Sequence, residues 1–179
     1  FDVCIGTPPP PPANDNCIGA IALTVNPDQS CDEVTAGTVT AATPSGVSST
    51  CGGTPSDDVW FSFVATGPEH IIRIMDIQGS TTDMYHALFT GECGDLTLVP
   101  NSCSDPELSQ PSGLTPGTTY YVRVYTYTSS TGQQVNFNVC VGSPQPPPAN
   151  DECAAAIPLT VNTDHDCDVV TPGTITGAT

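Results

Sequence analysis

The sequence predicts an all-β fold: a two-sheet sandwich of jelly-roll or immunoglobulin/fibronectin III-like type, reinforced by disulfides and repeated in tandem. Three observations support this prediction. Short segments rich in β-branched and aromatic residues alternate with turn residues. No stretch shows a helical hydrophobic period of useful length. Finally, residues 1–43 return as residues 137–179, with about two-thirds of their positions identical.

The repeat has a constant offset of 136 residues. Three pairs of cysteines share this offset: Cys4 and Cys140, Cys17 and Cys153, and Cys31 and Cys167. Self-similarity at a fixed period is typical of arrays of packed or serial units. We therefore expect this chain to be part of a tandem array, whose function lies in extension or multiplicity.

Two proline runs mark the expected boundaries. Residues 8–12 and 144–148 should form polyproline II spacers, which rise about 3.1 Å per residue and resist collapse. Residues 13–143 are then one complete repeat. Residues 1–7 would be the last strand of a preceding repeat, and residues 149–179 the first strands of the next.

Eight strands are expected in the complete repeat. The first two, Ile18–Val25 and Val34–Ala42, are rich in β-branched and small apolar residues. Asp58–Ala65 carries aromatic residues, and the Gly67-Pro68 turn separates it from the β-branched His70–Ile77.

The last four strands follow the same rule. Met84–Phe89 and Leu96–Val99 are short apolar segments. Thr119–Tyr127 follows a Pro116-Gly117 turn, and Val135–Val141 alternates apolar and polar residues. Eight short strands in one domain predict a sandwich of two sheets.

Two local signatures sharpen the prediction. The segment Leu114-Thr-Pro-Gly-Thr-Thr-Tyr120 is typical of a tyrosine corner that leads into a late strand. The only tryptophan, Trp60, lies in the third expected strand, where we expect it in the middle of the sandwich as a packing anchor rather than a ligand-stacking surface.

The charge of the chain excludes several functions. The chain has 19 acidic residues and only two basic ones, Arg73 and Arg123, so its formal net charge is −17. Nucleic acid and anionic membranes require a basic surface, so neither is expected as a partner. No segment is long and apolar enough for membrane insertion. The same charge keeps neighbouring copies apart and attracts divalent cations.

The cysteines indicate an oxidising, extracellular location. The repeat explains their odd number, since each unit owns six: Cys17, Cys31, Cys51, Cys93, Cys103 and Cys140. Zinc binding is disfavoured because the chain has no Cys-x-x-Cys pair.

The pairing of the cysteines is left open, because six allow fifteen connectivities. Cys93 and Cys103 flank a short excursion whose ends could meet. One scheme adds three further pairs: Cys31 with Cys51, Cys4 with Cys17, and Cys140 with Cys153. In this scheme a disulfide, a spacer staple, would bridge each proline spacer. A competing scheme joins Cys17 to Cys140 within one unit.

Calcium is the one cofactor for which the sequence offers ligands. Hard oxygen ligands are supplied by Asp15, which recurs as Asp151, by Asp57 and Asp58, and by Asp105. None has an EF-hand or nonapeptide spacing, and acidic loops in an acidic protein are more often only solvated. No other cofactor is expected.

Glycans are a second candidate ligand. Four tyrosines could offer stacking surfaces: Tyr85, Tyr121, Tyr125 and Tyr127. Alternating tyrosines on a strand more often cover the sheet or pack between copies, and this interpretation is preferred here.

An enzyme is not expected. The histidines His70, His86 and His165 lie in unrelated segments, and glutamine replaces His165 in the preceding copy, which disfavours a general base there. No motif of a hydrolase, metalloprotease or phosphate-binding loop is present.

Four motifs together resemble repeats of very large secreted surface proteins of gliding and predatory Bacteroidetes. They are Pro11-Pro-Ala-Asn-Asp-Asn-Cys17, Asp57-Asp-Val-Trp-Phe-Ser-Phe63, Gly91-Glu-Cys-Gly-Asp-Leu-Thr97 with Cys103-Ser-Asp105, and Pro116-Gly-Thr-Thr-Tyr-Tyr-Val-Arg-Val124. The resemblance covers essentially the whole chain. It implies export to the cell surface by the secretion system these bacteria use for adhesins. The sandwich is also similar to bacterial pre-peptidase C-terminal domains, and neither family implies a catalytic residue.

The sequence thus predicts a structural and adhesive repeat of a large extracellular filament or cell-surface adhesin. Its expected partners are neighbouring repeats of the same chain and other copies in a homo-oligomeric filament. Residues 151–179 are expected to pack against such a copy. The alternative is a carbohydrate-binding module, with or without calcium, that contacts cell-surface glycans.

Overall fold

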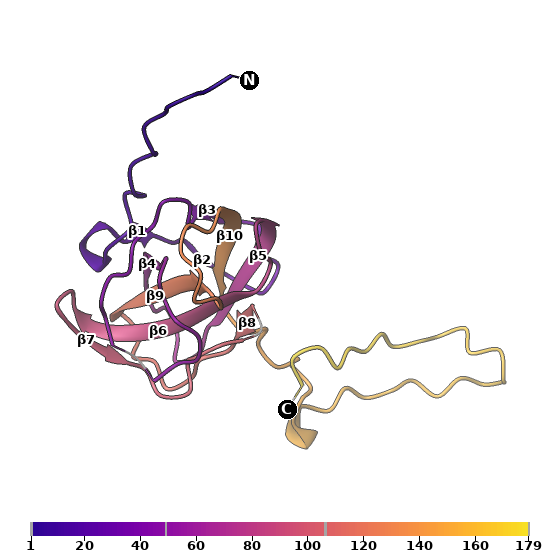
Figure 1. Ribbon diagram of the computed structural model, residues 1–179. Coiled ribbons are helices and arrows are strands. Elements are labelled where there is room, and N and C mark those ends of the chain that lie inside the picture. Colours follow the sequence, from indigo (N-terminus) through magenta and orange to yellow (C-terminus); the bar gives the residue numbers. More distant parts are fainter. Residues whose placement is uncertain (1, 49, 106, 179) are drawn as a thin grey trace. The chain divides into compact units, whose positions relative to one another are not determined.

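The computed structural model describes residues 2–48, 50–105 and 107–178. The chain divides into two compact units, one ending at Ser143 and one beginning at Pro144. Every strand among the described residues lies in the first unit, while the second is a long loop with one 3-10 turn, η2 (Cys153–Ala155) (Figure 1). Among these residues there is no helix with the length and apolar character needed to cross a membrane.

Two β-sheets form the first unit. The first sheet has the order β1–β4–β9–β6–β7. Its strands are β1 (Ile21–Ala22), β4 (Val59–Val64), β9 (Thr119–Thr126), β6 (Met84–Glu92) and β7 (Asp95–Leu98). The second sheet has the order β2–β10–β5–β8, and β3 also pairs with β10. Its strands are β2 (Val25–Asn26), β10 (Val135–Gly142), β5 (Ile71–Gly79), β8 (Leu108–Ser109) and β3 (Thr35–Thr38).

The main core fills the space between the two sheets. Alternate residues of β4, β9 and β10 point into it, so each strand contributes every second side chain. These residues include Val59, Phe61, Phe63, Val122, Val124, Phe137, Val139 and Val141, all at most 3% exposed. The predicted all-β, two-sheet sandwich is therefore confirmed.

Trp60 is fully buried, but it does not lie between the sheets. It belongs to a second cluster with Ala87 and Phe89, on the opposite face of the same strands from the main core. The 3-10 turn η1 (Cys17–Gly19) covers part of this outer face. Trp60 is thus an anchor for packing, as predicted, whereas its predicted position in the middle of the sandwich is wrong.

The predicted tyrosine corner is confirmed. The hydroxyl of Tyr120 accepts a hydrogen bond of 2.9 Å from the backbone N–H of Thr115, five residues earlier. This bond fixes the turn that leads into β9.

Six of the eight predicted strands appear with small shifts of their ends, and the sequence did not predict β8. The predicted strand Ile18–Val25 is wrong as a single element. Its first half pairs with β4 of the first sheet and its second half with β10 of the second sheet, so the chain crosses between sheets near Leu23. The predicted strand Val34–Ala42 shortens to β3 because the chain turns at Ala41, which has a positive φ of 63°.

The described parts of the flanking segments form no strands, and their assignment to a preceding and a following repeat stays a prediction. Residues 2–7 are extended and exposed, and residues 149–178 contain turns and the short η2. In the body, β1, β2 and β3 pair only with β4 and β10. Residues 149–178 contain no counterparts of β4 and β10, and a strand without a partner has no ladder of hydrogen bonds.

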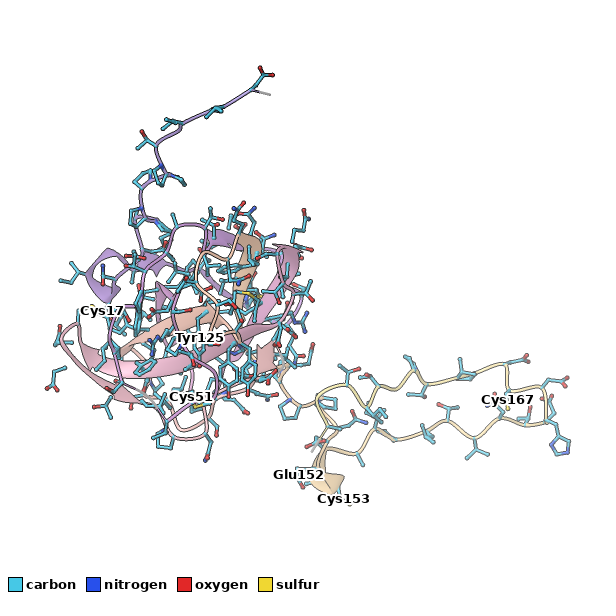
Figure 2. All side chains as sticks on the ribbon, in the orientation of Figure 1. Cys17, Cys51, Tyr125, Glu152, Cys153 and Cys167 are labelled. Carbon is cyan, nitrogen blue, oxygen red and sulfur yellow. A yellow bond between two sulfur atoms is a disulfide. The ribbon has the colours of Figure 1, made fainter. Side chains whose placement is uncertain are left out.

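Three disulfides close within the first unit. They join Cys17 to Cys93, Cys31 to Cys140, and Cys51 to Cys103. Three further cysteines are free and exposed: Cys4, Cys153 and Cys167. Cys17 and Cys51 lie on the body, and Cys153 and Cys167 lie on the C-terminal unit (Figure 2).

All the predicted pairings are wrong. Cys93 lies in the β6–β7 turn, whereas Cys103 precedes Ser104, which bridges to His86 near the other end of β6. His86 and Cys93 are seven residues apart along this extended segment, which is a distance of about 23 Å. Cys103, beside His86, is therefore far beyond the reach of a disulfide with Cys93. Pairing of Cys93 with Cys103 is therefore excluded.

The other predicted pairs fail because they join different faces. Cys17 and Cys51 belong to the outer face of the first sheet, while Cys31 and Cys140 meet on the second sheet. This separation excludes Cys31–Cys51 and Cys17–Cys140. The predicted spacer staples Cys4–Cys17 and Cys140–Cys153 are wrong because Cys17 and Cys140 already have partners within the body.

The C-terminal unit repeats local turns of the body at the 136-residue offset. Asn162 donates its amide to Val169 O at 2.8 Å and accepts from Val169 N at 2.9 Å. Asn26 makes the same two bonds with Glu33 at the same distances. Cys31 and Cys167 both adopt a positive φ, of 58° and 49°. These turns are therefore encoded locally and form without the rest of a sandwich.

Candidate functional site

The outer face of the first sheet holds the densest group of buried polar and aromatic side chains. Arg123 on β9 is 1% exposed, and its Nε donates to Asp58 Oδ2 at 2.7 Å. Its Nη1 donates to Val47 O at 2.8 Å. The guanidinium lies 5.6 Å from the ring centre of Trp60 and 5.5 Å from that of Tyr125. Two aromatic rings, a carboxylate and a carbonyl of the protein thus surround the cation.

Three of the four calcium candidates fasten loops. Asp15 accepts from the backbone N–H and the hydroxyl of Thr43, both at 2.6 Å. Asp58 accepts from the N–H of Ser45 at 2.8 Å and also from its hydroxyl. Asp57 accepts from the N–H of Thr126 at 3.1 Å and from its hydroxyl at 2.7 Å. Each carboxylate thus holds both donors of one serine or threonine.

These carboxylates are not assembled as a metal site. Asp105 is exposed, and the part of the chain that the structure describes contains no group of three His, Cys, Asp or Glu placed to hold a metal ion. The pKa of Asp57 lies above its usual value, and burial is the largest cause. The hydrogen bonds from Thr126 lower the pKa by less than burial raises it, and the charge of Asp58 adds to the rise. Calcium binding remains a prediction, which melting with and without a chelator would test.

The four tyrosines form two groups. Tyr85 stacks on Tyr125 with ring centres 5.3 Å apart and on Tyr127 at 5.7 Å. Tyr125 is fully buried, and its hydroxyl donates to Gly52 O at 2.7 Å. Burial, with a smaller contribution from the neighbouring Tyr85, raises the pKa of the Tyr125 hydroxyl. Tyr121 is separate and packs against the cluster around Trp60.

One tyrosine ring retains an open surface. Tyr127 is 44% exposed, although the loop at Gly53 lies against its edge. A Cβ at Gly53 would approach the Tyr127 ring to 3.1 Å, and the φ of Gly53 is +76°, so glycine suits this close contact. Most of the tyrosine surface therefore covers the sheet, and Tyr127 is the most exposed of the four rings.

Two histidines are buried among structural contacts. The Nε2 of His70 accepts from the N–H of Thr66 at 3.0 Å and of Gly67 at 3.3 Å, so Nδ1 carries the proton that is shared with Gly142 O at 3.2 Å. His86 is fully buried, and its Nε2 lies 2.7 Å from Ser109 Oγ. Both rings are positioned to remain neutral and to link segments.

Acid is expected to destabilise the sandwich through these rings. Burial lowers the pKa of His70 and lowers that of His86 to about 4. The unfolded chain therefore binds protons from about pH 6.5 downwards, before the folded chain does. His86 alone should reduce the free energy of unfolding by about 3 kcal/mol between pH 7 and pH 4.

Urea denaturation at a series of pH values measures this effect. His86→Leu should reduce the slope between pH 6.5 and pH 4 and leave the part that belongs to His70, whereas His165→Gln, a change at an exposed site, should keep the whole slope. An equal slope in the wild type and in His86→Leu would contradict the assignment to His86.

An apolar groove of about 440 Å³ runs beside β1 and β4. Its lining consists of apolar and hydroxyl side chains and contains no titratable group: Ala22, Leu23, Val25, Ser62, Phe63, Val64, Thr66 and Thr119. This groove therefore brings no acid, base or nucleophile pair together.

Comparisons with solved structures add only distant likenesses. The pre-peptidase C-terminal domain of collagenase from Bacillus anthracis is 14% identical, with a TM-score of 0.37, over 68% of this chain and 93% of that domain. The periplasmic inhibitor of g-type lysozyme from Aeromonas hydrophila is 13% identical, with a TM-score of 0.36, over 68% of this chain and 98% of the inhibitor. Likeness at this level carries no statement on function. No curated protein matches the chain.

A family model gives the decisive comparison. Residues 13–139 match a galactose-binding-domain-like family that is associated with the type IX secretion system. The match begins directly after the first proline run and covers the sandwich through most of β10. The association of this family with the secretion system, together with three disulfides, indicates a secreted protein. The chain belongs to the galactose-binding-domain-like family associated with type IX secretion.

Proposed function

We propose that residues 13–143 are a structural and adhesive repeat of a large cell-surface filament or adhesin. In this proposal, successive sandwiches follow one another in series and the proline spacers keep them apart. Neighbouring sandwiches of the same chain, and other copies in a filament, are the partners. The unit contributes length and strength rather than a reaction.

The exposed apolar side chains outside the sandwich support this proposal most directly. Val3 is 75% exposed and Ile5 is 95% exposed. Their counterparts at the 136-residue offset, Val139 and Val141, are core residues that are at most 1% exposed. The same holds for Ile175, 89% exposed, whose counterpart Val39 is 1% exposed. These side chains have the identity of core residues and would be buried in further sandwiches before and after this one.

Charge and spacers favour a serial arrangement over a compact one. A net charge of −17 repels neighbouring copies at moderate salt. Polyproline segments of this length remain extended. Successive units should therefore stay separated along the chain.

Immunogold electron microscopy of the native cell surface tests the proposal. An antibody raised against the sandwich is expected to mark surface fibres at many points along their length. Label on single, unattached particles in the medium, with none on the surface, would contradict it. An antibody absorbed with the pure protein is the control.

Carbohydrate binding is the second candidate, and Tyr127 is the observation that favours it. This ring is nearly half exposed and is held in place by its stack on Tyr85. On a glycan array, saturable binding by the chain that is lost in Tyr127→Ala and kept in Tyr121→Phe would support it. We expect no such binding, because Tyr85, Tyr125 and Tyr121 are used in packing and one remaining ring gives little stacking surface.

A further inference from the structure

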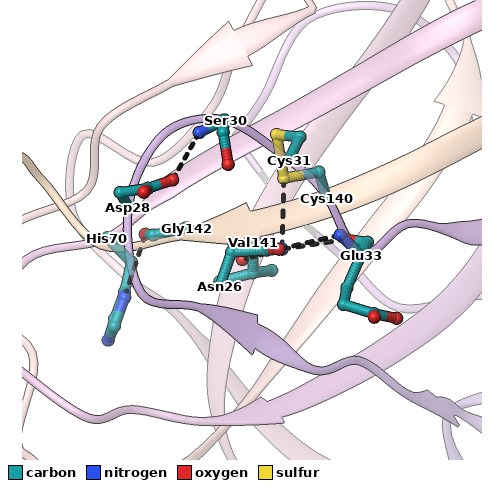
Figure 3. Close-up of a disulfide and its surroundings, with 9 residues drawn as sticks. All are labelled: Asn26, Asp28, Ser30, Cys31, Glu33, His70, Cys140, Val141 and Gly142. Carbon is teal, nitrogen blue, oxygen red and sulfur yellow. Dashed lines mark hydrogen bonds between the residues drawn. A yellow bond between two sulfur atoms is a disulfide. The ribbon is translucent and has the colours of Figure 1, made fainter.

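The last strand of the sandwich is joined to the loop between β2 and β3 by an unusually complete set of contacts. Cys140 on β10 is 1% exposed and forms a disulfide with Cys31 in that loop. Beside it, the side-chain amide of Asn26 donates to Val141 O at 3.0 Å and approaches Cys140 Sγ at 3.6 Å (Figure 3). The N–H of Ser143, where the chain leaves the sandwich, donates to Asn26 O at 3.0 Å.

The loop holds its own shape before β10 reaches it. Asn26 bonds to both backbone groups of Glu33, and Ser30 N donates to Asp28 at 2.8 Å. The equivalent loop in the C-terminal unit forms the bonds of Asn162 with no β10 beside it, and its Cys167 is exposed. The loop therefore presents its cysteine in a preformed turn to the last strand of its own unit.

The position of this disulfide determines the covalent path through the sandwich. A pull on the two proline spacers enters the body at residue 13 and leaves it at residue 143. With Cys31–Cys140 closed, the shortest covalent route runs from 13 to 31, across the disulfide, and from 140 to 143. Residues 32–139 lie off this route.

We infer that Cys31–Cys140 is a covalent shunt, which carries tension from one spacer to the next around the body of the sandwich. The direction of the pull rests on the proposed function, in which units follow one another in series. Full unfolding under tension then releases only about 20 residues, or about 70 Å of chain. Without any disulfide, the same event releases residues 13–143, or about 450 Å.

The other two disulfides have different positions relative to this route. Cys51 and Cys103 both lie within residues 32–139, which are off the route, so removal of their disulfide leaves the route unchanged. Cys17–Cys93 becomes the shortest path only when the shunt is absent. The route then runs from 13 to 17, across to 93 and on to 143, or about 190 Å.

Single-molecule force spectroscopy on the whole chain, held by handles at both ends, tests the shunt. All proteins would carry serine in place of the free Cys4, Cys153 and Cys167, so that no new disulfide can form. The contour length between residues 13 and 143 after unfolding should be about 70 Å in the oxidised chain and about 450 Å after reduction in place. Cys31→Ser with Cys140→Ser should give about 190 Å.

The matched control is Cys51→Ser with Cys103→Ser, which removes a half-buried crosslink from the same body. It should keep the short increment of the oxidised chain. An oxidised increment close to the reduced one, or a lengthening in this control, would overturn the shunt. Because reduction in place uses the unmutated crosslinks, the test remains decisive even if a double variant does not fold. A failure here leaves the surface labelling of fibres untouched, so the two proposals fail separately.

Discussion

Asp58→Asn is expected to lower the free energy of unfolding by about 3–5 kcal/mol. The change leaves the guanidinium of Arg123 in a site that is 1% exposed, with a neutral amide in place of its carboxylate partner. A buried charge without a partner loses its hydration and regains little. The same change disturbs the hold of the carboxylate on Ser45.

Guanidinium chloride denaturation of the oxidised chain measures this loss. Asp105→Asn is the matched control, since the same chemical change at an exposed site should stay within about 0.5 kcal/mol of the wild type. A loss below about 1 kcal/mol for Asp58→Asn would contradict the role of the ion pair. Replacing both partners with apolar residues should be much milder than the single change.

Removal of the Cys31–Cys140 disulfide is expected to cost about 4–5 kcal/mol. The bond closes 109 residues, and the loss of entropy that a crosslink imposes on the unfolded chain grows with the closed length. Breaking it also frees the contacts of Asn26 with Val141. The variant Cys31→Ser with Cys140→Ser should therefore unfold at much lower denaturant.

The free cysteines provide the comparison for this variant. Cys4→Ser and Cys153→Ser remove thiols without removing a crosslink, so their denaturation midpoints should match the wild type. A midpoint for the double variant equal to theirs would show that the bond adds nothing to stability.

The strands could be predicted where alternation was strong. In β4, β9 and β10 every second residue is apolar, and this pattern predicts the strands; in β10, where Asn136 and Asn138 alternate with apolar residues, it also predicts the buried face. β8 is only two residues long and lies at a sheet edge, so it leaves no pattern to read. Ile18–Val25 looked continuous because both halves are apolar, although they pair with different sheets.

The position of Trp60 shows a second limit of prediction from the sequence pattern. Both faces of β4 carry large apolar side chains, so alternation alone does not tell which face meets the other sheet. The covering of the outer face, around Val47 and Cys51, comes from a Ser-, Gly- and Pro-rich segment with little hydrophobic signal. One feature of the sequence did indicate that the outer face is covered. Arg123, one of the two basic residues, lies in the middle of the apolar strand Thr119–Tyr127, which is an unusual place for a solvated side chain.

The disulfides could not be predicted because their pairing depends on which loops the two sheets bring together. The spacing of Cys93 and Cys103 favoured a local bond, but the length of β6 holds them apart. The repeat period nevertheless explains the free cysteines. At the 136-residue offset, Cys4, Cys153 and Cys167 correspond to Cys140, Cys17 and Cys31, each of which is bonded within the sandwich.

Each sandwich is expected to close its disulfides within itself and to leave the proline spacers without any. Mass mapping of non-reduced peptides from a natural chain with two or more complete repeats tests this most directly. The expected result is three linked peptides per repeat, equivalent to Cys17–Cys93, Cys31–Cys140 and Cys51–Cys103, with none across a spacer. A peptide that joins Cys140 of one repeat to Cys153 of the next would contradict the claim.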